Sequence, residues 1–248
     1  HELKRLVALA QQLGELHWRL DEGEHGLGRA RYGVAVAPGS AAAWAGTFPH
    51  NPFQAPVLVD MSVDAAQIAP RLLQGQIREA VNAVRLLRQA RAELDAKTKA
   101  SNLASLSWSD LTQEERQLCP PLILVGNDQS LGGSGFAQLA WLLNSELPVK
   151  VLVLSELDLG LGDSHTGIKL NASRDSRSNL GMMALAQRKA FVAQSSIAAP
   201  EHLRDSVREG MKFAGPALIS VNVPSPERHG FATTHPLQHA AHAIPTPT

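Results

Sequence analysis

The sequence predicts an α/β protein whose parallel sheet is covered by helices on both faces. Four near-continuous apolar segments of strand length support this fold, because strands that are buried on both faces carry apolar residues at almost every position. Helix-length segments separate these strands, as crossover connections between parallel strands require. The predicted strands are Leu122 to Val125, Val149 to Leu154, Phe191 to Gln194 and Ala217 to Val221, with helices over Phe136 to Asn144, Leu180 to Lys189 and Glu201 to Ala214.

An N-terminal region of helices and loops precedes this core. Leucines and other apolar residues from Leu3 to Leu20 recur at helical spacing, which predicts an amphipathic helix that ends in the turn-rich segment 21–28. A second apolar face, from Ile77 to Leu94, predicts a long helix. These two helices expose more apolar surface than one α/β domain covers, so we expect a homodimer or a docked partner in a hetero-oligomer.

The long helix also carries five arginines that lie largely off its apolar face. We interpret them as solvated or paired with other groups, and an anion-docking face is the alternative. They are Arg71, Arg78, Arg85, Arg88 and Arg91.

Short elements complete the N-terminal region. Segments 32–37 and 57–61 read as strands, segment 38–56 as an ordered loop without a period, and segment 97–109 as a polar linker. Thr112 and Glu115 have the spacing of a capping box, which predicts a short helix that Pro120 and Pro121 stop. The expected organisation is an N-terminal part of the same domain at 1–118, an α/β core at 119–230 and a tail at 231–248.

Composition excludes several classes of protein. Lysine plus arginine and aspartate plus glutamate number 23 each, so no strong field favours nucleic acid or an anionic membrane surface. No apolar run approaches the roughly 20 residues of a spanning helix, and no leader is evident, so a cytoplasmic location is expected. The single cysteine, Cys119, excludes an internal disulfide framework and any iron-sulfur cluster held by this chain alone. Because the chain begins at His1, we expect a piece of a longer protein.

The glycine-rich segment 126–135 follows the first core strand and is the main candidate for a ligand site. Ligands of open α/β sheets bind beyond the carboxyl ends of the strands, so the loops at 126–135, 155–179 and 222–235 should converge on one edge. Backbone N–H groups behind glycines can receive a diphosphate, and Asp128 offers a carboxylate to magnesium. A dinucleotide turn is disfavoured because the Gly-x-Gly-x-x-Gly order is absent.

Histidines in the tail offer a second candidate. His235, His239 and His242 have a spacing that places imidazoles on one helix face, as zinc sites do. The prolines around them favour a mobile tail instead.

Three motifs in 120–230 resemble one known family. They are the glycine turn after a buried strand, Leu180-Gly181 ahead of Val192-Ala193-Gln194, and His229-Gly230. This pattern is similar to the thiamine-diphosphate-binding C-terminal part of the pyruvate:ferredoxin (flavodoxin) oxidoreductase family. The resemblance implies the thiamine-diphosphate-binding fold, with the cofactor bound by Gly126, Asp128, Gly133 and Gly135.

The resemblance also implies a magnesium site, with departures from the family pattern. The family's metal-binding aspartate corresponds to Asp128, but Asn127 and Gln129 replace the glycines that flank it. Leu161 stands where the family has a metal-binding asparagine, and leucine has no oxygen to donate. Asp163 is the predicted second metal ligand, and Asp158 is the alternative.

The implied activity is oxidative decarboxylation of a pyruvate-like 2-oxo acid. Coenzyme A would take the acyl group, iron-sulfur clusters on other domains or subunits would take the electrons, and ferredoxin or flavodoxin would be the acceptor. Catalytic residues remain unassigned, and activity of the chain alone is not expected, since the family's activating glutamate lies in another domain. The alternative is a cofactor-free structural or interaction module within a larger redox assembly.

Overall fold

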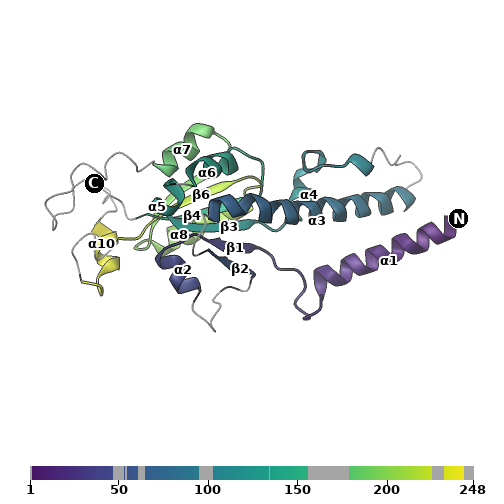
Figure 1. Cartoon of the computed structure of the whole chain (residues 1–248), viewed down its shortest axis with the longest axis horizontal. Coiled ribbons are helices and arrows are strands. Elements are labelled where there is room, and N and C mark those ends of the chain that lie inside the picture. Colours follow the sequence, from purple (N-terminus) through teal and green to yellow (C-terminus); the bar gives the residue numbers. More distant parts are fainter. Residues whose placement is uncertain are drawn as a thin grey trace.

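One six-stranded sheet with all strands parallel forms the centre of the computed structural model (Figure 1). The structure describes residues 2–46, 53, 55–60, 65–94, 103–133, 135–155, 179–224 and 232–242. The strand order is β2-β1-β3-β4-β6-β5. The strands are β1 (Gly33–Val36), β2 (Val57–Val59), β3 (Leu122–Asn127), β4 (Val149–Ser155), β5 (Phe191–Ser196) and β6 (Ala217–Asn222).

The α/β fold class predicted from the sequence is confirmed. The four apolar segments of the core are neighbours, paired as β3 with β4, β4 with β6, and β6 with β5. The two short segments of the N-terminal region, β1 and β2, extend the same sheet beyond β3. Apolar residues at consecutive positions of the central strands are buried because helices cover both faces.

Helices form a layer on each side of the sheet. One face is covered by α3 (Ala65–Leu94), α5 (Asp128–Gly132), α6 (Phe136–Leu143) and α7 (Leu180–Gln187) (Figure 1). Their buried leucines pack against inward side chains such as Leu124 and Val151 in the main core. The other face carries α2 (Ser40–Ala45), which packs on Val34 and Val36, and α8 (Pro200–Lys212), whose Gly210 lies against Ile219.

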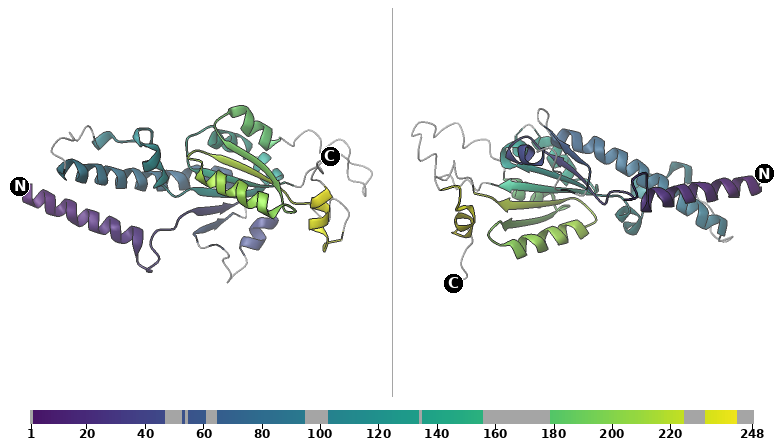
Figure 2. Two further views of the ribbon diagram at one scale, coloured as in Figure 1. Left: turned by 180° about the vertical axis from the view of Figure 1, so that it is seen from behind. Right: turned by 90° about the horizontal axis from the view of Figure 1, so that it is seen from below.

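The predicted N-terminal helix, α1 (Glu2–Asp21), is confirmed and lies beside the part of α3 that extends away from the sheet (Figure 2). Two ion pairs, Arg5 with Glu93 at 2.8 Å and Arg19 with Glu79 at 3.8 Å, show that the helices run antiparallel. The chain leaves α1 through a tight turn. Gly28 adopts a φ of 65°, and a Cβ there would lie 2.4 Å from the carbonyl oxygen of Leu20, so the turn requires glycine.

The described part of the segment after α3, residues 103–117, is more ordered than a polar linker. It contains the short 3₁₀ helices η1 (Leu103–Ser105) and η2 (Trp108–Asp110), followed by α4 (Gln113–Gln117). The predicted capping box is confirmed, since Thr112 Oγ1 accepts a hydrogen bond from the Glu115 amide and Glu115 accepts one from the Thr112 amide. Arg85 donates to the carbonyl oxygens of Leu103 and Leu106. Arg85 is therefore paired within the chain.

Two further segments differ from the sequence predictions. Helix α2 lies within the segment read as a loop without a period, since a six-residue alanine-rich helix is too short to show one. The tail contains α10 (Pro236–His242), whose Ala240 is fully buried, where the prolines had favoured a mobile segment. Proline at the first helical position is compatible with a helix, because that residue's N–H has no intrahelical partner. None of the described helices is long and apolar enough to cross a membrane.

Candidate functional site

The direction of the chain connections changes between β1 and β3. From β1 the chain passes through α2 on one face to the edge strand β2, whereas from β3 it passes through α5 and α6 on the other face to β4 (Figure 1). In open parallel sheets, ligands bind at such switch points, outside the carboxyl ends of the strands. The topology therefore selects the carboxyl ends of β1 and β3 as the candidate site, which we call the β1–β3 switch point.

Two polar residues, Asp60 and Asn127, lie at strand ends of the β1–β3 switch point. Asp60 comes directly after β2, is 6% exposed, and donates its backbone N–H to the carbonyl oxygen of Val36 at the end of β1. Gly39, at the start of α2, has a φ of 134°, and a Cβ there would lie 3.6 Å from the side-chain nitrogen of Asn127. The loop after β1 and the end of β3 are thus in close contact. The site brings together β1, β2 and β3.

The segment predicted as an open glycine turn is instead a strand end followed at once by a helix. β3 continues through Asn127, and α5 begins at Asp128. Asn127 Oδ1 accepts a hydrogen bond from the Ser130 amide at 2.8 Å, and Ser130 Oγ accepts one from the Asn127 amide at 3.1 Å. This reciprocal cap starts the helix immediately, which is why the turn prediction for 126–135 was wrong in its first half.

Gly126 is required by the packing of the protein itself. A Cβ at this position would lie 2.8 Å from Leu131 Cγ, 2.9 Å from Ser130 Oγ and 3.0 Å from Ala37 Cβ. Such distances leave no space for a side chain. Gly126 therefore allows β3, α5 and the end of β1 to approach one another.

The four residues predicted to bind the cofactor lie at the two ends of α5. Gly126 and Asp128 lie at its start, and Gly133 and Gly135 lie beyond its end. A Cβ on Gly133 would lie 2.8 Å from the carbonyl oxygen of Gln129, so this glycine also has a packing role. Their binding roles stay predictions.

Asp128 is the predicted metal ligand that lies among the described residues. It is half-buried at the first position of α5, and its side chain has no hydrogen-bond or ion-pair partner among the described residues. The second predicted ligand, Asp163, lies outside the described residues, as do Asp158, Leu161, His229 and Gly230. Within the described ranges, no three His, Cys, Asp or Glu side chains form a group that could hold a metal ion.

The first residues of the other two predicted loops lie at the same edge of the sheet. Ser155, at the end of β4, is in register with Asn222, at the end of β6, and the Val223 amide donates to the Ser155 carbonyl at 2.8 Å. Asn222 is 5% exposed. Asp60 and Asn222 were not among the site residues predicted from the sequence. Each is a polar residue at the end of an apolar strand, and this position is the signal that could have identified them.

A Ser–His contact occurs at the edge of the sheet formed by β5, away from the candidate site. Ser195 Oγ lies 2.9 Å from His202 Nδ1, which links the end of β5 to the first turn of α8. No carboxylate among the described residues contacts His202, so the arrangement lacks the third member of a hydrolytic triad. This contact is best explained as an anchor for α8.

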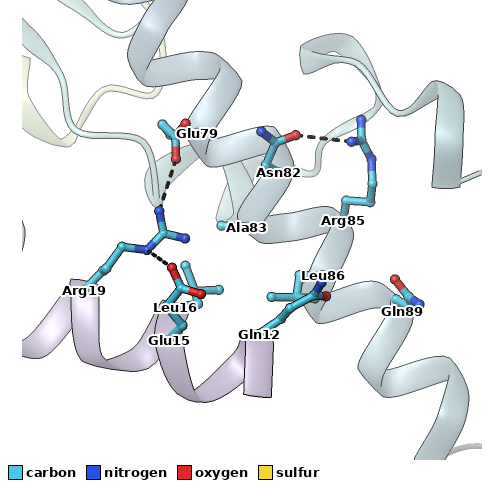
Figure 3. Close-up of a pocket in the computed structure, with 10 residues that line it drawn as sticks. All are labelled: Gln12, Glu15, Leu16, Arg19, Glu79, Asn82, Ala83, Arg85, Leu86 and Gln89. Carbon is cyan, nitrogen blue, oxygen red and sulfur yellow. Dashed lines mark hydrogen bonds and ion pairs between the residues drawn. The ribbon is translucent and has the colours of Figure 1, made fainter. Parts of the chain in front are cut away.

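A groove of about 310 Å³ lies between α1 and α3 (Figure 3). Several of its charged groups already interact, since Arg19 is 3.9 Å from Glu15 and 3.8 Å from Glu79. It shares no residue with the β1–β3 switch point. The other lining residues are both polar and apolar: Gln12, Leu16, Asn82, Ala83, Arg85, Leu86 and Gln89.

Comparison with known proteins finds a structural match but no sequence match. No protein-family model matches the chain, and no curated protein matches it either. A solved structure of 2-oxoglutarate:ferredoxin oxidoreductase from Magnetococcus marinus, with 2-oxoglutarate, coenzyme A and succinyl-CoA bound, is similar with a TM-score of 0.55 and 11% identity. The match covers 92% of this chain and 66% of that one. At this identity, the similarity establishes a common fold.

Proposed function

We propose that this chain is a domain or subunit of a 2-oxoacid:acceptor oxidoreductase and carries its thiamine-diphosphate and magnesium fold. The observation that supports the proposal most is the β1–β3 switch point, which has Asp128 at the start of α5 in a fold similar to that of a 2-oxoglutarate:ferredoxin oxidoreductase. Motifs along 120–230 agree with the same family. Neither the 2-oxo acid nor the catalytic residues follow from these observations.

The described residues at the β1–β3 switch point fit a magnesium diphosphate in part. Asp128 offers a carboxylate without a described partner, whereas Asn127 Oδ1 is occupied by the Ser130 amide. We assign the second ligand to Asp163 in segment 156–178. Bound thiamine diphosphate would supply the electron sink for decarboxylation, and this chain would hold its diphosphate near Gly126, Gly133 and Gly135.

The remaining parts of the reaction belong to partners under this proposal. Iron-sulfur clusters reside on other domains or subunits, because Cys119 is the single cysteine of the chain. Burial raises the pKa of the Cys119 thiol to about 11, so it is not a thiolate ligand near neutral pH. Ferredoxin or flavodoxin in the cytoplasm would accept the electrons.

A specific contact favours the alternative, a structural module that has kept the fold without the cofactor. Ser130 and Leu131 fill the space beside Gly126, and Asn127 is engaged in capping α5. A ligand that approaches the backbone at Gly126 would need this cap to rearrange. The two functions therefore differ in one measurable property, affinity for the cofactor.

Titration calorimetry with thiamine diphosphate distinguishes the two proposals. The chain is titrated with and without magnesium, first alone and then with the partner chains of its oxidoreductase. Magnesium-dependent binding supports the enzymatic function. No heat of binding in any of these mixtures, with the chain folded by circular dichroism, would establish the structural module.

A further inference from the structure

We draw no further inference here: the strongest candidate, the apolar surface patch over α6 and α7 with the exposed side chains of Trp141, Met182 and Leu185, supports no proposal because nothing in the described part of the structure shows what covers it.

Discussion

Arg88 on α3 and Glu115 on α4 form a two-point ion pair, with Nε to Oε1 at 2.8 Å and Nη2 to Oε2 at 2.5 Å. The hydrogen bonds from Arg88, followed by that from the Thr112 amide, lower the pKa of Glu115 to about 2. This pair attaches segment 103–117 to α3. It also explains one of the helix arginines, which is paired within the chain rather than presented to an anion.

The Arg88–Glu115 pair predicts a loss of stability in acid. Because the pKa of Glu115 is lower in the folded than in the unfolded chain, its contribution is complete above pH 4.5 and decreases as the pH falls toward 2. Glu115→Gln should remove this part of the pH dependence, about 1–2 kcal/mol for a partly solvated pair. Urea unfolding at pH 3 and pH 7 measures it. Glu114→Gln, an exposed neighbour on α4, should retain the acid sensitivity of the parent.

The buried lysine of β4 predicts a second rise of stability with pH, this time in the alkaline range. Lys150 Nζ donates to the carbonyl oxygens of Phe213 at 2.6 Å and Gly215 at 2.7 Å, and burial lowers its pKa to about 8. Between pH 8 and 10.5 the unfolded chain binds more protons than the folded one, so stability should rise with pH by about 2 kcal/mol.

Lys150→Met should abolish that rise. It should also cost about 1–3 kcal/mol at pH 7, because two carbonyl oxygens lose their donor. Lys189→Met, at an exposed lysine, is the control. An equal rise between pH 8 and 10.5 in parent and Lys150→Met protein would contradict the assignment.

Gly126 predicts a local steric effect. Gly126→Ala should lower the free energy of unfolding by about 1–3 kcal/mol, since a methyl group would overlap Leu131, Ser130 and Ala37. Gly132→Ala is the matched control within α5. The nearest atom to its Cβ would be Leu180 Cδ2 at 3.8 Å, an ordinary contact, so stability should stay within about 1 kcal/mol of the parent. Thermal unfolding of the three proteins measures the difference.

Asp128 predicts the metal dependence of the proposed site. Asp128→Asn should abolish magnesium-dependent binding of thiamine diphosphate, because the amide is a weaker ligand for a hard cation. The melting temperature should change little, since Asn127 rather than Asp128 caps α5. Calorimetry of this variant is compared with Asp205→Asn on α8, which should bind as the parent does. An unchanged affinity in Asp128→Asn would show that other residues bind the metal. Asp158 and Asp163 would be the first to test.

Much of the fold was predictable because its signals are local. Apolar runs identified β3 to β6, and the spacing of leucines identified α1. The Thr112–Glu115 spacing predicted the cap that starts α4. The site was predicted only in part. Asp128 lies at the expected edge of the sheet. The start of α5 was predicted as a turn, because the glycines of segment 126–135 indicate a turn and the Asn127–Ser130 cap was not recognised.

By itself, the sequence determined the strands of the sheet, the longer helices between them, and that the sheet is parallel. Each of these depends on residues within about one helix length of one another. Only the tertiary structure decided that β1 lies between β2 and β3, which puts the switch point beside Asp128, and that α1 lies antiparallel along α3. These features arise from contacts between residues far apart in the chain, such as Ala37 with Gly126 and Arg5 with Glu93, which no local pattern specifies.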